Sequence, residues 1–157
     1  MKNLLAESIM LKKRNNKVII GRREIVDFPM LQLLQLEAKI DTGAYTSALH
    51  CKDIKLREID GKTTLCFKLL DETHPEYNEK EFHFTDFTKK TIKSSFGESE
   101  ERYIIKTTIH IAHRKISSTI SLTDRTNMRF PVLIGRKLLN GKFMVDVSKK
   151  HTGGFSQ

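Results

Sequence analysis

The amino-acid sequence predicts an all-β protein that closes into a barrel, with one short helix near the C-terminal end. Short runs of β-branched and aromatic residues recur along the chain, separated by turn residues. Residues 81–87 alternate strictly between apolar and polar, which indicates a half-buried strand. Only residues 135–140 have a helical pattern. Many short strands joined by turns are typical of closed all-β folds.

In chain order, strands are expected over residues 18–20, 24–28, 36–40, 63–70, 81–87, 103–111, 116–122 and 143–147. The first two strands are expected to form a hairpin around Gly21, Arg22 and Arg23. Pro29 should end the second strand, because proline has no N–H to donate to a neighbouring strand.

Turn residues define the remaining connections. Asp60-Gly61 should form the turn that leads into the fourth strand, and residues 71–80 should form a polar loop. A turn at 112–114 should pair the two long strands on either side of it. Gly141 suits the end of the short helix.

Length and composition fit one globular domain. The chain has 157 residues, of which 30% are charged and 38% hydrophobic. We expect a flexible segment over residues 1–16, a folded domain over 17–150 and a tail over 151–157. No apolar run is long enough to span a membrane or to act as a signal peptide, so a cytoplasmic protein is expected. In that compartment Cys51 and Cys66 should remain thiols.

The formal net charge of +9 raises the possibility of a nucleic-acid interface. However, basic residues crowd the N-terminal part and acidic residues crowd 71–81, and no aromatic residues suited to base stacking accompany the basic cluster. A solvated basic surface is therefore favoured over nucleic-acid binding. A third interpretation is that the positive field attracts an acidic substrate or partner.

The most informative motif is Asp41-Thr42-Gly43-Ala44, which follows the predicted strand 36–40. A strand that ends in a Gly-containing turn can hold a carboxylate in a fixed position. The alternative is that Asp41 only bonds its own backbone in an Asx turn. A second run, Ile134-Gly135-Arg136, lies far downstream after apolar residues. Together the two motifs resemble half of an aspartic protease.

The chemistry of such a site requires two carboxylates. A close pair cannot ionise twice, so it shares one proton and can both activate water and donate to a substrate carbonyl. This chain has one Asp-Thr-Gly, so the second carboxylate would be Asp41 of another subunit. Thr42 would then link the two loops through its hydroxyl, and Gly43 would allow close backbone approach.

A broader resemblance covers nearly the whole chain. It rests on residues 20–23, 38–44, 46–50, 93–97, 101–102, 125–128 and 131–136. These segments are similar to a bacterial family of retropepsin-like proteins that carries the name "ATP-dependent zinc protease" and is linked to ATP-grasp glutamate ligases. The resemblance implies a single-lobe retropepsin-like barrel with Asp41 as the catalytic residue. Many members of the family carry Arg where this chain has Tyr45.

The sequence does not support a nucleotide or a metal in the mechanism. It contains no Gly-rich phosphate loop ending in Lys-Ser or Lys-Thr, and no His-Glu-x-x-His. His110 and His113 are three residues apart, which places them on opposite faces of a strand. We therefore expect no cofactor and no metal ligands.

Further residues are assigned from their position around the loop. Ile134, Gly135 and Arg136 are expected to support the Asp41 loop, with Gly135 both entering the helix and packing on the loop. For Arg136 an ion pair is favoured over substrate binding.

Residues 89–101 are either a flap over the cleft or a plain surface hairpin; the candidate flap residues are Ser94, Ser95, Phe96 and Gly97. Arg102 is expected to pair with Glu98 or Glu101. His50 and Cys51 either line the site or pack in the core.

These expectations converge on a homodimeric aspartic-type peptidase that acts on a peptide or protein. The family's link to glutamate ligation and the basic charge suggest an acidic, glutamate-tailed substrate. The alternative is a non-catalytic dimeric module that binds peptide or protein on the same fold. No membrane partner is expected, and nucleic acid is disfavoured.

Overall fold

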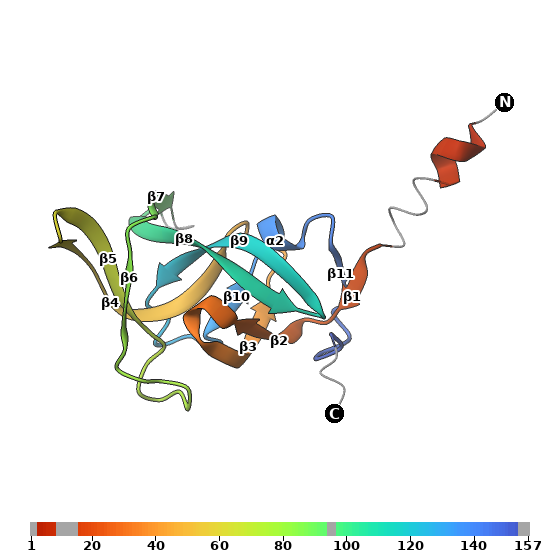
Figure 1. The fold of residues 1–157 in the computed structure, drawn as a ribbon. Coiled ribbons are helices and arrows are strands. Elements are labelled where there is room, and N and C mark those ends of the chain that lie inside the picture. Colours follow the sequence, from red (N-terminus) through yellow and green to blue (C-terminus); the bar gives the residue numbers. More distant parts are fainter. Residues whose placement is uncertain (1–2, 9–15, 94–96, 154–157) are drawn as a thin grey trace.

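The computed structural model describes residues 3–8, 16–93 and 97–153. The strands are β1 (Val18–Ile20), β2 (Arg23–Phe28), β3 (Leu33–Ile40), β4 (Ser47–Ile59), β5 (Lys62–Leu69), β6 (Glu81–Phe84), β7 (Thr88–Lys93), β8 (Ser99–Ile111), β9 (Arg114–Thr123), β10 (Val132–Ile134) and β11 (Phe143–Val145). The helices are η1 (Pro29–Leu31), α2 (Arg136–Leu139) and a segment at residues 4–8. The predicted all-β class and the short helix near the C-terminal end are confirmed (Figure 1).

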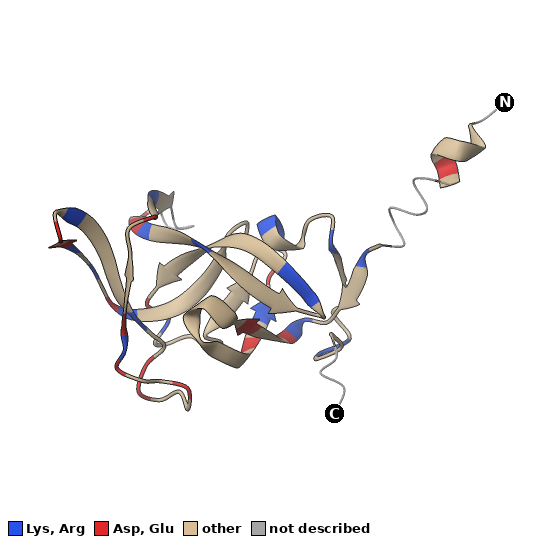
Figure 2. Ribbon diagram, in the orientation of Figure 1, with Lys and Arg blue, Asp and Glu red and all other residues tan. Residues whose placement is uncertain are grey.

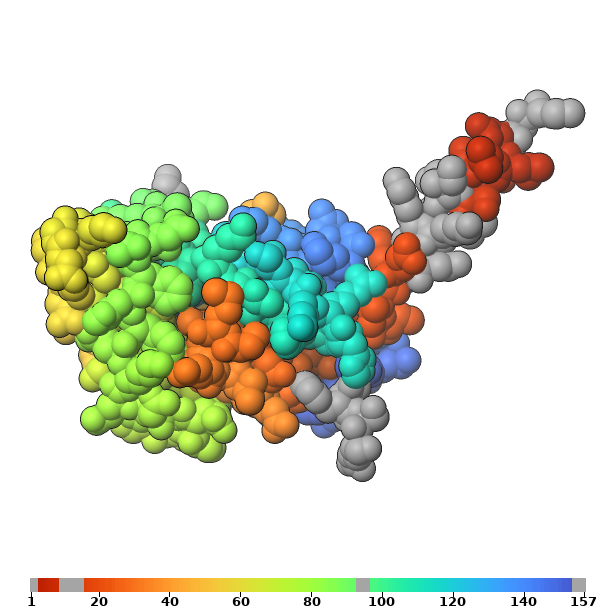
Figure 3. Space-filling model, in the orientation of Figure 1, coloured from red at the N-terminus to blue at the C-terminus, as the bar shows by residue number. Residues whose placement is uncertain are grey.

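Backbone pairing joins six strands into a ring, in the order β10, β3, β2, β8, β9, β4 and back to β10. The predicted closed barrel needs one correction, because the sheet as a whole does not close. β5 and β6 continue from β4 outside the ring, and we call β4, β5 and β6 the arm. The arm forms one end of the molecule in Figure 3, coloured yellow to green.

The length of β4 explains why the sheet extends beyond the ring. Ser47 to His50 pair with β9, whereas the rest of this 13-residue strand pairs with β5. β8 is equally long, and its first residues pair with β7. β4 and β8 are both longer than their partners in the ring. Their remaining backbone N–H and C=O groups therefore pair with a further strand, β5 and β7 respectively.

Two predicted turns are confirmed, and their backbone angles show why they form. Asp60 and Gly61 have φ values of 52° and 74° and connect β4 to β5. Ala112 and His113 have φ values of 51° and 62° and connect β8 to β9. Positive φ at both central residues matches the right-handed twist of a hairpin.

The core fills the ring with side chains from every ring strand. Fully or almost fully buried examples are Phe28, Leu36, Leu49, Ile105, Ile109, Ile120 and Val132. Burying such a side chain stabilises the fold by roughly 1.5–3 kcal/mol before the entropic cost is counted. Cys51 and Cys66 are buried free cysteines, as expected.

The predicted hairpin around residues 21–23 is wrong. β1 pairs in parallel with β11, and β2 pairs with β3 and β8. The reason lies in Gly21, where an added Cβ would stand 2.3 Å from the carbonyl oxygen of Lys149. The chain therefore turns against the segment that follows β11, an interaction that local sequence does not reveal.

Three strands, β4, β7 and β10, have no counterpart among the expected strands, and several strand bounds also differ from the prediction. β4 was not expected, because its second half carries many charged residues. β6 ends at Phe84 although the alternation continues to Phe87. Lys and Arg (blue) and Asp and Glu (red) both occur on the arm in Figure 2, which is typical of solvated strands.

The segment that follows β11 is held to β2 by hydrogen bonds of its backbone. His151 donates its N–H to the carbonyl of Arg23, and the N–H groups of Thr152 and Gly153 donate to the carboxylate of buried Glu24. The predicted division at residues 16 and 150 stays a prediction. None of the helices in the described part of the chain is long and apolar enough to cross a membrane.

Candidate active site

Asp41 lies where β3 ends, beside the end of β10. These strands run in parallel with Ile40 opposite Ile134. The Asp41 N–H donates to the Ile134 carbonyl at 2.8 Å, which continues the pairing by one residue. The sheet therefore fixes the backbone at the point where the loop begins.

The loop itself orients the Asp41 carboxylate. Gly43 donates its N–H to Oδ1 at 2.9 Å, and Ala44 donates its N–H to the Asp41 carbonyl at 3.2 Å. This is the Asx turn that the sequence raised as an alternative, and it is compatible with a functional role. The carboxylate is partly exposed, while Thr42 and Gly43 are exposed.

The segment from 134 to 137 supports this loop through its backbone. Arg136 donates its N–H to the Ala44 carbonyl at 2.8 Å, and Lys137 donates to the Tyr45 carbonyl at 2.9 Å. A Cβ on Gly135 would lie 2.7 Å from the Tyr45 carbonyl oxygen and 2.9 Å from that of Ala44. Gly135 also caps α2, so both predicted roles of this residue are present in the structure.

Arg136 contributes through its side chain. Its guanidinium donates to the Thr42 carbonyl at 3.0 Å and lies 5.9 Å from the centre of the Tyr45 ring. Among the described residues of one subunit, these contacts with a neutral carbonyl and an aromatic face take the place of the expected ion pair, and an ion pair with a second subunit stays a prediction. Thr42, Tyr45 and Arg136 also border a cavity of about 530 Å³ next to the loop.

Sequence reasoning missed Ser47, which connects three segments of the site. Its buried hydroxyl accepts the Gly135 N–H at 3.1 Å, and its carbonyl accepts the Ser121 hydroxyl at 3.1 Å. Ser47 begins β4 directly after the loop. The available signal was its position within residues 46–50, one of the segments that carry the family resemblance.

The candidate flap is a β-hairpin at its base, since β7 and β8 pair as far as Lys93 opposite Ser99. Ser94, Ser95 and Phe96 lie outside the described residues, and Gly97 has φ of 80°. A role as a flap stays a prediction. Arg102 pairs with Glu100 at 3.2 Å rather than with Glu98 or Glu101, because residues two apart share a strand face.

A second buried polar group lies on β4, where its pairing with β9 ends. His50 is buried and bonds Asp71 through Nε2 at 2.6 Å, while its Nδ1 accepts the Arg125 N–H at 2.7 Å. With these partners Nδ1 is the acceptor and Nε2 is the donor. His50 therefore packs rather than lining an open site, and it positions the backbone of Arg125.

Arg125 is a positively charged residue that interacts electrostatically with Asp41. Its side chain is half-buried and donates from Nε to the Phe130 carbonyl at 3.1 Å. Burial lowers its pKa and the charge of Arg102 lowers it further, whereas the negative charge of Asp41 acts in the opposite direction. Arg125 is thus influenced both by the positive charge of Arg102 and by the negative charge of the candidate catalytic carboxylate.

The Asp71 carboxylate should make stability depend on acid pH. Bonds from the Thr73 hydroxyl and N–H, and then from His50, lower its pKa from 3.8 to about 2. The ionised form is favoured by folding, so its contribution is present above about pH 4 and is lost as pH falls toward 2. That contribution is about 2 kcal/mol.

We therefore expect the Asp71→Asn variant to lose less unfolding free energy than the wild type between pH 5 and pH 2. Urea titrations at each pH measure this slope, and Glu72→Gln at a neighbouring exposed carboxylate serves as the control. An identical acid slope in the wild type and Asp71→Asn would contradict the assignment.

The structure also assembles a set of metal-ligating atoms that the sequence analysis did not find. Cys66, Glu81 and His83 each place one ligand atom within 4.8 Å of the others. Glu81 and His83 are two residues apart in the alternating run, which was the available signal. Cys66 joins them only through strand pairing.

Comparisons with known proteins agree with the fold. A solved structure from Legionella pneumophila, described as a protein with unknown function (DUF785), superposes with a TM-score of 0.67 at 24% identity, over 87% of this chain and 98% of that one. This likeness defines the fold class. Residues 19–155 match the model of the RimB-like family, described as retropepsin-like aspartic endopeptidase RimB. The chain belongs to this family.

Curated relatives carry a different name. Proteins named "Probable alpha-L-glutamate ligase" from Shewanella pealeana and Desulfotalea psychrophila are 34% and 30% identical to this chain, over 86% and 83% of it. The matches cover 30% and 28% of those relatives, so the chain spans under a third of their length.

Proposed function

We propose that this protein is an aspartic-type peptidase that acts as a homodimer, with Asp41 from each subunit forming one water-activating pair. The observation that carries the proposal is the Asp41 loop. It presents one carboxylate, oriented by its own turn and fixed to the 134–137 segment by backbone hydrogen bonds. Membership of the RimB-like family supports the same chemistry.

A second subunit supplies what the single loop lacks. Within the described residues, no other carboxylate hydrogen-bonds Asp41, and the sequence has no second Asp-Thr-Gly. The exposed Thr42 and Gly43 leave the loop free to meet its copy across a two-fold axis. The paired carboxylates would share a proton, so that one activates water while the other donates to the substrate carbonyl.

We further propose that the substrate is acidic, with glutamate-tailed proteins as the main candidates. The positive charge of Arg102 lowers the pKa of Arg125, and the negative charge of Asp41 acts on Arg125 in the opposite direction. An acidic side chain bound there would relieve the repulsion between the two guanidinium groups. Relatives named as probable glutamate ligases contain a segment similar to this chain, which is consistent with such a substrate.

The test compares cleavage of a glutamate-tailed peptide with that of the same peptide carrying a glutamine tail. We expect cleavage of the acidic peptide to be faster and to slow as ionic strength rises, because salt screens the attraction. Equal cleavage of both peptides would contradict the acidic substrate. Absence of cleavage of both by a confirmed dimer would contradict the peptidase itself.

Arg125→Gln should reduce kcat/KM for the acidic peptide by about 10- to 100-fold, which corresponds to loss of one charged contact. The glutamine-tailed peptide should be affected much less. Arg129→Gln is the matched control, because it removes an exposed arginine from the same loop. An equal loss of activity toward both peptides would assign Arg125 a structural role.

A further inference from the structure

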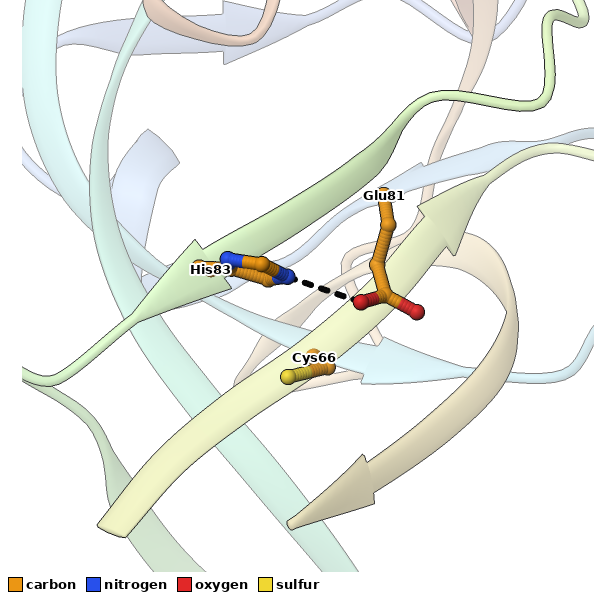
Figure 4. A group of neighbouring side chains, drawn as sticks. All are labelled: Cys66, Glu81 and His83. Carbon is orange, nitrogen blue, oxygen red and sulfur yellow. Dashed lines mark hydrogen bonds and ion pairs between the residues drawn. The ribbon is translucent and has the colours of Figure 1, made fainter. Parts of the chain in front are cut away.

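Three side chains of different chemistry converge on one face of the arm, as Figure 4 shows. Cys66 on β5 lies opposite His83 on β6, and Glu81 is two residues before His83 on the same face. His83 Nε2 is 2.7 Å from Glu81 Oε1. The ligand atoms of all three residues lie within 4.8 Å of one another.

This combination of donors matches one group of metal ions. Thiolate, imidazole and carboxylate together are ligands of zinc, and zinc accepts three protein ligands with water in the fourth position. Cys66 is fully buried, whereas the side chains of Glu81 and His83 are 23% and 46% exposed. The set therefore has a closed side formed by sulfur and an open side through which an ion can enter.

A cation already contacts all three ligand atoms. The Arg57 guanidinium donates from Nε to Cys66 Sγ at 3.4 Å and from a terminal nitrogen to Glu81. That same nitrogen is 3.3 Å from His83 Nε2. The Arg57 side chain is 44% exposed, so it can swing into solvent without opening the core.

We propose that Cys66, Glu81 and His83 form a binding site for a zinc-like divalent ion, and that Arg57 occupies the position of the ion when none is bound. The ion would join β5 to β6 and so stabilise the open part of the sheet. Arg57 is ten residues along β4 from Ser47, on the order of 30 Å for an extended strand. The site is thus separate from the Asp41 loop.

Binding would change the protonation and hydrogen bonding of the ligands. Cys66 would release its proton to solvent as sulfur coordinates, and His83 would exchange its bond with Glu81 for a bond to the ion. Arg57 would lose its three contacts and turn outward. Because ligands must be deprotonated, affinity should fall as pH decreases.

The test uses Co²⁺ as a spectroscopic substitute for zinc on the full chain. We expect one equivalent of Co²⁺ to produce a thiolate-to-cobalt charge-transfer band, and excess Zn²⁺ to remove it. Zn²⁺ should also raise the melting temperature, and a chelator should reverse this rise. The His83→Gln variant, changed at an exposed position, should bind at least about tenfold more weakly.

Two cysteine variants separate this site from incidental thiol binding. Cys66→Ser should lose the charge-transfer band, whereas Cys51→Ser should keep it, since Cys51 is an equally buried cysteine outside the cluster. No stoichiometric binding, or a band that persists in Cys66→Ser, would overturn the proposal. Unchanged affinity in His83→Gln would do so as well, whatever the stability of the cysteine variants.

Arg57→Gln tests the role given to the guanidinium. Removing a competing cation should tighten Zn²⁺ binding several-fold, because the ion no longer displaces Arg57 from three contacts. Lys55→Gln removes a neighbouring positive charge on the same strand and should have a smaller effect. Weaker binding in Arg57→Gln would refute the idea that Arg57 occupies the ion's position.

Discussion

Replacement of Asp41 by Asn is expected to lower peptide cleavage by at least about 10³-fold while the proposed dimer persists. Asparagine keeps the size of the side chain and an oxygen that can accept the Gly43 N–H, so the loop should retain its shape. It cannot share a proton with a second carboxylate, so water would not be activated. The measurement is kcat/KM on the acidic peptide, with dimerisation followed by sedimentation.

Asp146→Asn is the matched control for this experiment. Asp146 also accepts the N–H of the residue two positions on, from Ser148 at 3.0 Å, but no Gly follows it in an Asp-Thr-Gly motif. Its replacement should leave activity within about twofold, as is usual for surface substitutions. Full activity in Asp41→Asn would refute the catalytic assignment.

The pH profile distinguishes catalysis from binding alone. A carboxylate pair that shares a proton should give a bell-shaped dependence with two apparent pKa values that belong to the pair. A wild-type dimer that binds peptide tightly without cleaving it at any pH would instead support a non-catalytic binding module. The Asp41 variant and the wild type would then bind equally well.

Gly135→Ala is the substitution with the second largest expected effect. The new Cβ would stand below 3.0 Å from two backbone carbonyl oxygens, which cannot move without breaking the bonds to Arg136 and Lys137. We expect a loss of roughly 3 kcal/mol in unfolding free energy. Activity should be lost along with it, because the same bonds hold the Asp41 loop.

Gly141→Ala provides the comparison. Gly141 has φ of 77° and open space around its Cβ position, so alanine there costs only backbone strain of about 1–2 kcal/mol. Denaturant titrations measure both variants. If Gly135→Ala is no less stable than Gly141→Ala and remains active, the close approach is not required by the site.

The sequence predicted the elements whose signals are local. Alternation, β-branched runs and turn residues indicated most strands, and Asp60-Gly61 identified a hairpin directly. The Asp41 loop and the Ile134–Arg136 segment were predicted to meet, because together they resemble a known family. Pairing between segments that are distant in the sequence could not be predicted from local patterns, as the pairing of β1 with β11 illustrates.

The remaining errors have a common physical origin. β4 was not predicted because its first part is buried in the ring and its second part is exposed on the arm. Its sequence therefore does not show one apolar–polar alternation along its whole length. The roles of His50 and Arg125 depend on a contact between residues 75 positions apart. Cys66 and His83 meet through strand register, which a one-residue slip would abolish.

The pairing of β10 has a consequence for the order in which this chain acquires its structure. β10 has three residues, yet it lies between β3 and β4 and holds the Asp41 loop from a distance of more than 90 residues in sequence. Contacts of such separation carry a large loop-closure cost and form late in folding. During synthesis, the first 130 residues can therefore fold their local hairpins while the loop around Asp41 is still unsupported. We expect the emerging chain to become competent for function only once residues 132–137 have left the ribosome.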